Sequence, residues 1–261
     1  MPRLQPSAHL QHIKAILLDL SGVLHEGKKR LEGAVETVQW LRERNYILRF
    51  VTNTATQSST QIHRKLHDMG FELDSAELFT APQAARQYLI KHHLKPFLIL
   101  HPNLLEEFSD LQNDHPDSVL LGDAQDHLNY WNLNRAFQLI EQGAPLIGIG
   151  KNKYFMSDDG LQLDSGAFIQ ALEWASGCSA VIMGKPDQHF FAEVVASTGF
   201  AANQCLMVGD DVISDVCGAI AAGIVACQVQ TGKFKSDDLK YLPDEAHLIA
   251  SIQTLPELLA P

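Results

Sequence analysis

The sequence predicts an α/β fold, in which helices cover a Rossmann-like parallel sheet and a second α/β domain is inserted into the first. Two observations predict this fold. Short apolar runs suited to buried strands alternate with segments whose apolar residues recur at helical spacing. A long central stretch with its own strand-and-helix pattern interrupts this alternation, which then resumes. Alternating strands and helices favour a parallel sheet joined by right-handed crossovers.

Strand and helix signals can be placed along the chain in order. The first part predicts a strand at 13–18, a helix carrying Val35, Val38 and Leu41, a strand at 46–51, and a helix that Ser58 begins and Gly70 ends. The last part predicts a helix at 190–197, a strand at 205–208, a helix at 214–222 and strands at 224–229 and 247–252. The central stretch predicts strands at 97–100, 118–121 and 145–149 and helices at 84–92 and 133–142. We therefore expect a discontinuous core domain, 1–80 and 180–261, and an inserted domain, 81–179.

Composition excludes several classes of function. The 261 residues are 46% hydrophobic and 20% charged, which is an ordinary globular mixture. A net charge of −11 argues against a protein that binds nucleic acid or an anionic membrane surface. It does not argue against a small phosphorylated ligand, because a metal and one or two local cations can reverse the sign of a pocket. The four cysteines form no C-x-x-C pair, so we expect reduced thiols and a cytoplasmic protein.

Four polar clusters follow predicted strands or lie in loops that can reach the same sheet edge. They are Asp19 to Val23, Thr52-Asn53, Gly184-Lys185-Pro186, and Gly209-Asp210-Asp211 followed by Asp215. In open parallel sheets, ligands bind at the carboxyl ends of the strands. We therefore expect these clusters to meet there.

Such a set of side chains permits phosphoryl transfer, which needs a nucleophile, neutralisation of charge and positioning. Asp19 could be the nucleophile and form an aspartyl phosphate. Asp19 and Asp210 could share one Mg²⁺, which prefers oxygen ligands. Asp211 and Asp215 could hold waters or orient Asp210, and Lys185 would supply a fixed cation.

Each cluster taken alone also has a purely structural interpretation. Asp19 and the pair Thr52-Asn53 could be turn residues. Lys185 could be a solvated loop residue, and Asp210-Asp211 could be an acidic helix start that complements the dipole. The order of all four clusters makes the catalytic interpretation more specific than any one of them.

In this order the clusters resemble the four signature motifs of the haloacid dehalogenase superfamily, and the insertion resembles the cap of its subfamily IIA. Asp19 to His25, Tyr154-Phe155 and the stretch from Gly166 to Trp174 are similar to the branch that contains phospholysine phosphohistidine inorganic pyrophosphate phosphatase. The resemblance implies a core of this fold with an inserted cap. It also implies the following roles: Asp19 as nucleophile and Mg²⁺ ligand, the Ser21 carbonyl and Asp210 as further ligands, Asp211 and Asp215 as supporting acids, and Thr52, Asn53 and Lys185 as phosphate-binding residues.

Ser21 departs from the wider superfamily. Its phosphatases usually carry there a second Asp that acts as general acid and base. A serine hydroxyl is a poor proton donor near neutrality, so we expect a preference for good leaving groups and slow turnover. His25 is a possible substitute acid, although a single histidine is more often structural.

Two lysines of the insertion are candidate substrate contacts. Lys151 and Lys153 follow the apolar run 145–149 and could contact an anionic substrate. A solvated charged loop is the alternative.

The sequence therefore predicts a Mg²⁺-dependent phosphatase that hydrolyses a small phosphorylated substrate through an aspartyl phosphate on Asp19. A phosphate ester, a phosphoramidate, pyrophosphate or a phosphoprotein remain open as substrates, as does a homodimer; neither nucleic acid nor a membrane is expected as a partner. Two other functions remain open. A catalytically weak scaffold would release no phosphate, and a metal-independent dehalogenase would work in the presence of a chelator.

Overall fold

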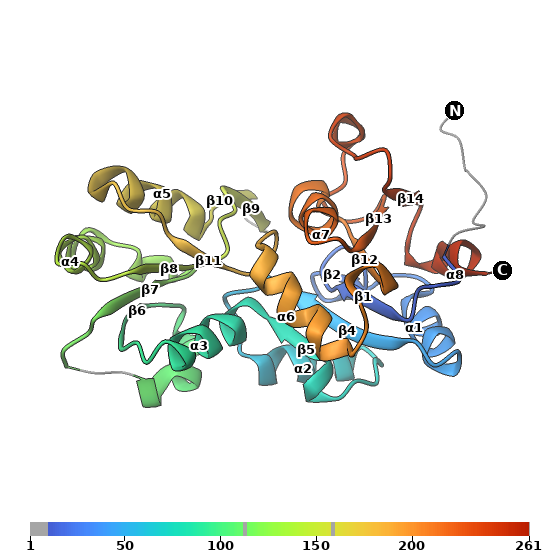
Figure 1. The fold of residues 1–261 in the computed structure, drawn as a ribbon, viewed down its shortest axis with the longest axis horizontal. Helices are drawn as coiled ribbons and strands as arrows, with labels where there is room; N and C mark the ends of the chain where they lie inside the picture. Colours follow the sequence, from blue (N-terminus) through green and yellow to red (C-terminus); the bar gives the residue numbers. More distant parts are fainter. Residues whose placement is uncertain (1–9, 112–113, 158–159, 261) are drawn as a thin grey trace. The chain divides into compact units, whose positions relative to one another are not determined.

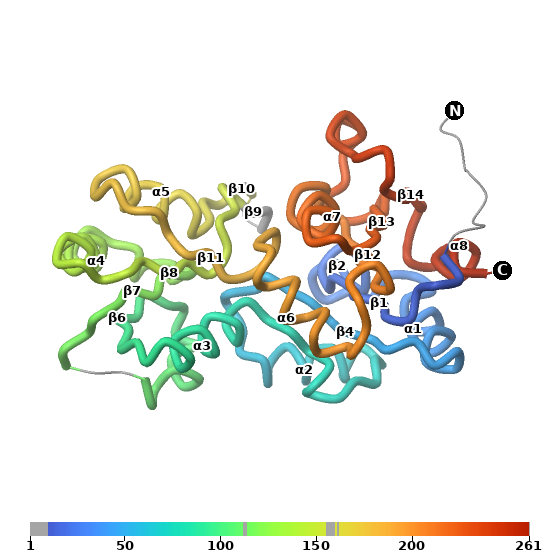
Figure 2. The backbone as a smooth tube through the Cα atoms, in the orientation of Figure 1, coloured from blue at the N-terminus to red at the C-terminus, as the bar shows by residue number. Residues whose placement is uncertain are grey.

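The structure of the protein is a computed structural model that describes residues 10–111, 114–157 and 160–260. The chain divides into two compact units. Unit 1 consists of Met1–Thr52, His63–Phe79 and Lys185–Pro261, and unit 2 consists of Asn53–Ile62 and Thr80–Gly184. Figure 2 lets the path be followed by colour, from blue in unit 1 through green and yellow in unit 2 to orange and red back in unit 1.

Unit 1 is built on a six-stranded sheet with the order β14-β13-β12-β1-β4-β5. Its strands are β1 (Ala15–Asp19), β4 (Ile47–Thr52), β5 (Leu78–Thr80), β12 (Cys205–Gly209), β13 (Val225–Val229) and β14 (His247–Ile249), with the hairpin β2 (His25–Glu26) and β3 (Lys29–Arg30). Its helices are α1 (Ala34–Glu43), α2 (Ser59–Asp68, whose start falls in unit 2), α6 (Gln188–Thr198), α7 (Gly218–Ala221), α8 (Leu255–Leu259) and a π-helix (Val212–Cys217). Short 3₁₀ helices lie at Ser75–Glu77, Ala202–Gln204, Ser236–Lys240 and Ile252–Thr254.

The centre of this sheet is apolar because it is covered on both faces. All five residues of β1 and all five of β12 are buried. Such strands read as continuous apolar runs rather than as alternating ones. β1 pairs in parallel with β12 on one side and with β4 on the other. Burial of each large aliphatic side chain contributes about 1.5–3 kcal/mol, so these strands fix the sheet edge on which the polar clusters lie.

Unit 2 is a smaller α/β layer structure. Its parallel sheet has the order β11-β8-β7-β6, and β9 and β10 form a separate antiparallel hairpin. The strands are β6 (Pro96–Ile99), β7 (Ser118–Leu121), β8 (Leu146–Ile149), β9 (Tyr154–Ser157), β10 (Gly160–Leu163) and β11 (Val181–Met183). The helices are α3 (Ala81–Lys91), α4 (Tyr130–Glu141) and α5 (Ser165–Ser176), with 3₁₀ helices at Pro102–Leu111 and Gln125–His127.

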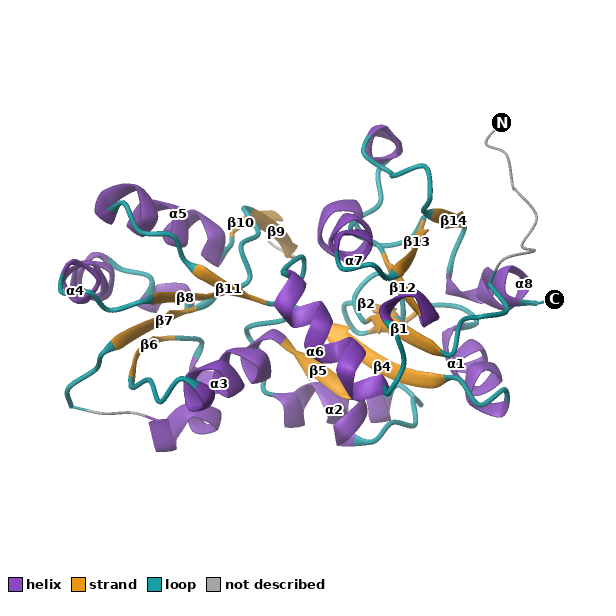
Figure 3. Cartoon of the chain, in the orientation of Figure 1, coloured by secondary structure: helices purple, strands orange, loops and turns teal. Residues whose placement is uncertain are grey.

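Two apolar clusters sandwich the sheet of unit 2. One joins the strands to α3 and the 3₁₀ helix Pro102–Leu111, and the other joins them to α4 and α5. Figure 1 shows α4 and α5 on one side of these strands and α3 on the other, and Figure 3 shows the alternation of strands and helices.

The predicted fold class, α/β with a parallel sheet, is confirmed. The predicted helix at 214–222 is wrong in detail, because the chain forms the π-helix Val212–Cys217 and then α7. Helices α5 and α8 and strands β2, β3, β5, β9, β10 and β11 were not predicted. No helix in the described part of the chain combines the length and apolar character needed to cross a bilayer.

Candidate active site

Asp19 and Asp210 leave the sheet at neighbouring positions. Asp19 is the last residue of β1, and Asp210 directly follows β12. The two strands pair in parallel with Leu18 opposite Val208, so both carboxylates lie at the carboxyl edge of the same sheet. The buried strands on which they sit hold their backbones in place.

β1 occupies a topological switch point. The chain continues from β1 to β4 on one side, whereas β12 lies on the other side. A crevice forms where connections leave a parallel sheet in opposite directions, and ligands bind there. Thr52, the last residue of β4, is buried at this edge, next to Val51, which pairs with Asp19.

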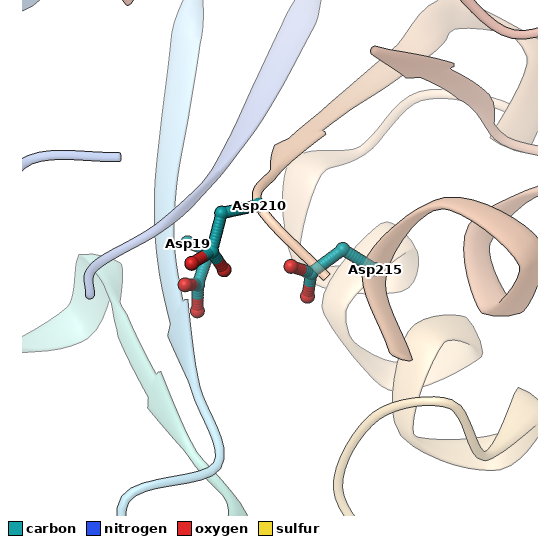
Figure 4. Close-up of side chains that lie close together, drawn as sticks. All are labelled: Asp19, Asp210 and Asp215. Carbon is teal, nitrogen blue, oxygen red and sulfur yellow. The ribbon is translucent and has the colours of Figure 1, made fainter. Parts of the chain in front are cut away.

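Three buried carboxylates converge at this point. Asp19, Asp210 and Asp215 each offer an oxygen within 4.8 Å of the others. Figure 4 shows the carboxylates of Asp19 and Asp210 close together, with Asp215 turned toward them from the neighbouring segment. Only 1–7% of each residue is exposed. Like charges this close repel strongly when water is largely excluded.

Lys185 forms an ion pair with Asp19. Its Nζ lies 2.5 Å from Asp19 Oδ1 and 2.7 Å from Asp215 Oδ1. Burial alone would lower the pKa of this lysine, but the two carboxylates more than offset that effect and raise its pKa above the ordinary value. Lys185 is therefore a permanently charged bridge between two of the three carboxylates.

One lysine does not balance the cluster. Burial, with the charges of Asp19 and Asp215, raises the pKa of Asp210 to about 8. Burial raises the pKa of Asp215 to about 6, although Lys185 opposes the shift. Raised carboxyl pKa values mean that burial and the neighbouring carboxylates disfavour the ionised forms more than the nearby lysine favours them. A further cation bound at this site would therefore reduce the repulsion among the three carboxylates.

Asp211 organises the segment that carries Asp215. Its Oδ1 accepts hydrogen bonds from the amides of Ile213 and Ser214, and its own amide donates to Asp215 Oδ2. Burial opposes ionisation, but these amide bonds and the charge of Lys233 lower the pKa of Asp211. Asp211 is therefore an ionised cap of the π-helix that also holds Asp215.

The comparisons with known proteins decide the family. A haloacid dehalogenase-like hydrolase model matches residues 16–113, and a HAD-hydrolase-like model matches residues 182–255. Haloacid dehalogenase-like hydrolase domain-containing protein 2 of Homo sapiens is 39% identical over 226 residues, which cover 87% of each chain. The chain belongs to the haloacid dehalogenase-like hydrolase family. Phospholysine phosphohistidine inorganic pyrophosphate phosphatase of Xenopus laevis is 38% identical over 237 residues, covering 88% of this chain and 87% of that one.

Solved structures of this hydrolase family share the fold. The 4-nitrophenylphosphatase of Thermotoga maritima has a TM-score of 0.88 at 26% identity and covers 96% of this chain and 98% of its own. A glycerol phosphate phosphatase of Mycobacterium tuberculosis, solved in complex with magnesium, has a TM-score of 0.82 at 26% identity, with 94% and 77% coverage. The superfamily and subfamily resemblance seen in the signature motifs is thereby confirmed.

Ser21 lies in the loop after β1 of this hydrolase, and His25 is the first residue of β2. Ser21 is exposed and forms an isolated bridge with His25, which is buried. Burial and the charge of Lys65 lower the pKa of His25 to about 4, against the opposing effect of Asp19. Near neutral pH the imidazole is therefore uncharged, which argues against His25 as the substitute acid.

The remaining predicted contacts belong to unit 2. Lys151 Nζ lies 2.8 and 2.7 Å from the two carboxylate oxygens of Glu173, so its charge is paired within this unit. Lys153 is exposed. Asn53 is the first residue of unit 2 and its side chain lies close to Gly184. Substrate contacts by these three residues stay predictions.

The sequence-based interpretation missed a turn that reaches the carboxylate cluster. Thr231, Gly232 and Lys233 follow β13 and contact the loop after β1 and Asp210. The signal in the sequence was a Thr-Gly-Lys triplet that begins two residues after the end of a buried strand, and the other polar clusters also lie at or just after strand ends.

Proposed function

We propose that this chain is a Mg²⁺-dependent phosphatase in which Asp19 accepts the phosphoryl group. The observation that carries the proposal is the buried carboxylate cluster bridged by Lys185 at the switch point of a parallel sheet. The phosphatase names of several relatives and solved neighbours support the same activity. We assign unit 2, close to the predicted inserted domain 81–179, the role of a cap.

The donor set fits Mg²⁺. Four carboxylates lie in or beside the cluster, namely Asp19, Asp210, Asp211 and Asp215, whereas the cations paired with them are Lys185 and Lys233. Four negative against two positive charges leave an excess that one divalent cation balances. Mg²⁺ takes oxygen ligands, one or two of them carboxylates. Asp19, Asp210 and the Ser21 carbonyl would hold it, and when bound it would neutralise charge on the transferring phosphoryl group.

Asp19 is poised as the nucleophile. Lys185 engages its Oδ1 from a buried position, so a fixed positive charge lies beside the attacking carboxylate. Attack of a carboxylate oxygen on phosphorus breaks the bond to the leaving group, which departs with the bonding electron pair. A water molecule then attacks the aspartyl phosphate, releases inorganic phosphate and restores Asp19. Lys185 keeps its proton throughout and stabilises charge by position alone.

Proton transfer is the weak point of this site. The exposed Ser21 hydroxyl has no useful pKa, and His25 is uncharged near neutral pH. Substrates whose leaving groups need little protonation are favoured, such as aryl phosphates, pyrophosphate or phosphoramidates that arrive protonated on nitrogen. A small phosphorylated compound is the proposed substrate class; a phosphoprotein substrate and a homodimer are further proposals.

Phosphate release from 4-nitrophenyl phosphate tests the function. We expect turnover with Mg²⁺, none with excess chelator, and loss of turnover in Asp19→Asn and Asp210→Ala. Asp110→Asn is the matched control, because Asp110 is an exposed partner of Arg86 in unit 2. After acid quenching, mass spectrometry of the wild-type protein should detect one added phosphoryl group that Asp19→Asn lacks.

Three outcomes would contradict the proposal. Full turnover in chelator would exclude the metal. Mg²⁺ binding without release of phosphate from any ester or P–N compound would favour a scaffold. Chelator-resistant release of halide from a haloacid would favour a dehalogenase.

A further inference from the structure

The turn after β13 is tied to the carboxylate cluster by three consecutive residues. The Thr231 hydroxyl donates to the Gly22 carbonyl at 2.5 Å. The Gly232 amide donates to Glu26 Oε1 at 3.0 Å, and the Lys233 amide donates to Asp210 Oδ2 at 2.7 Å. Three hydrogen-bond donors of the turn therefore bond to residues beside the proposed catalytic site, and not to the backbone of the turn itself.

Two glycines enclose the same carboxylate oxygen. A Cβ placed on Gly22 would lie 2.0 Å from Asp210 Oδ2, and a Cβ on Gly232 would lie 2.1 Å from that oxygen and 2.5 Å from the Gly22 Cα. Real Cβ atoms do not come so close, so Asp210 can occupy this position only if both neighbours lack a side chain. Both glycines also have positive φ angles, 84° and 66°, which glycine adopts without steric cost.

Asp210 is held at its backbone as well. The buried Gln228 of β13 donates from Nε2 to the Asp210 carbonyl at 2.6 Å. The carboxylate thus has a fixed backbone and one fixed oxygen, Oδ2.

We propose that the turn Thr231-Gly232-Lys233 positions Asp210 for cation binding, and that Gly232 is its critical residue. The inference rests on the proposed function, since it takes Asp210 as a cation ligand. It adds that residues which never touch the cation set the affinity for it. Partners that orient metal ligands typically change metal affinity by about 10–100-fold when they are removed.

A matched pair of glycine variants tests the inference. Gly199 has a φ of 75°, closes α6 in unit 1, and has no atom within 4 Å of a built Cβ. Gly232→Ala and Gly199→Ala therefore share the backbone strain, and only Gly232→Ala collides with Asp210. We expect Gly232→Ala to weaken Mg²⁺ binding about 10–100-fold by titration calorimetry. Gly199→Ala should bind Mg²⁺ as the wild type does.

Thermal unfolding in chelator separates positioning from stability. The collision should lower the midpoint of Gly232→Ala below that of Gly199→Ala without metal. The quantity that reports positioning is the rise in midpoint that added Mg²⁺ causes in each variant, and we expect this rise to be smaller for Gly232→Ala. In activity assays, the Mg²⁺ concentration for half-activation should rise, and the KM at saturating Mg²⁺ should stay near the wild-type value. Equal Mg²⁺ affinity of the two variants would overturn the inference.

A second pair serves if Gly232→Ala does not fold. Thr231→Val removes the hydroxyl that bonds the Gly22 carbonyl, whereas Thr231→Ser keeps it. We expect weaker Mg²⁺ binding in the Val variant and near wild-type binding in the Ser variant; equal binding by both contradicts the inference. Failure of the proposed function looks different, because Asp210→Ala would then bind Mg²⁺ as well as the wild type does.

Discussion

Polar residues follow the strands of both parallel sheets in this chain, but in the part that the structure describes they form a cluster in only one of the two units. At the carboxyl edge of unit 1, Asp19, Asp210 and Asp215 converge and share one buried lysine. In unit 2, Asp123 and Lys151 follow β7 and β8 within two residues. Asp123 accepts a hydrogen bond from the Gln125 amide, and Lys151 pairs with Glu173. Among the described residues, the three-carboxylate cluster occurs in unit 1 alone.

Strand order explains the difference. In unit 1 the chain places β4 and β12 on opposite sides of β1. Parallel sheets bind ligands at such a reversal of strand order, because the connections leave the sheet in opposite directions there. In unit 2, β6, β7, β8 and β11 lie side by side in chain order, and no such reversal occurs. In this chain, polar residues at strand ends therefore indicate a ligand-binding site where the strand order reverses, and do not indicate one where the strands follow chain order.

The largest expected effect comes from the buried lysine of unit 1. Lys185→Met leaves Asp19 and Asp215 without their shared cation. We expect kcat on 4-nitrophenyl phosphate to fall roughly 10³-fold, as expected when a preorganised charge is removed. Circular dichroism should establish that the variant is folded, because breaking a buried pair also destabilises proteins by about 3–5 kcal/mol. A folded variant with near-normal kcat would remove Lys185 from the proposed site.

The next largest effect is expected at Ser21, which occupies the position where related phosphatases usually carry a general acid. Ser21→Asp introduces a carboxyl group that can donate a proton to the leaving group. We expect rates on alkyl phosphates to rise by roughly 10²-fold, the lower end of general acid catalysis, with little change on aryl phosphates. The measurement is a rate series over leaving-group pKa for both proteins. A wild-type enzyme whose chemical step shows no leaving-group dependence would point to another proton donor.

The carboxylates of Asp210 and Asp215 in unit 1 should make the free energy of unfolding depend on pH. The folded pKa values of Asp210 and Asp215, about 8 and about 6, exceed the ordinary 3.8. The folded protein thus holds protons that the unfolded chain has lost, so its stability in chelator should fall as pH rises between about 4 and about 8. Mg²⁺ at a hundredfold excess over its Kd at pH 8 should stabilise the protein by about 2.7 kcal/mol at that pH, and the same Mg²⁺ concentration should stabilise it less at about pH 5.

Denaturant unfolding at both pH values, with and without Mg²⁺, measures this effect. Asp210→Asn should flatten the dependence on pH in chelator, because it removes the more strongly shifted carboxyl group. Mg²⁺ stabilisation of equal size at both pH values would show that the carboxylates do not titrate as the geometry implies.

The smallest effect is expected at the lysine of unit 2. The side chains of Lys151 and Glu173 are 37% and 11% exposed, so their ion pair is partly screened by solvent. Lys151→Met should change the free energy of unfolding by less than about 1 kcal/mol. It should change kcat/KM by less than about threefold, the equivalent of ~0.6 kcal/mol. A tenfold loss of kcat/KM with unchanged stability would instead support Lys151 as a substrate contact.

The sequence by itself determined the fold class and the candidate residues at the edge of unit 1. Apolar periodicity and strand-ending polar clusters are local properties, and they sufficed to predict the parallel sheet and to single out Asp19, Lys185 and Asp210. The family motifs then placed the chain among the haloacid dehalogenase-like hydrolases.

Only the tertiary structure decided how these residues interact. The pairing of Lys185 with both Asp19 and Asp215 joins segments that are 166 and 30 positions apart in sequence. The burial that leaves His25 uncharged, and the bond from the Lys233 amide to Asp210, likewise depend on neighbours distant in the chain. Charge balance and pKa are set by burial and by atoms within a few ångströms, and neither quantity is encoded by residue type or spacing along the sequence.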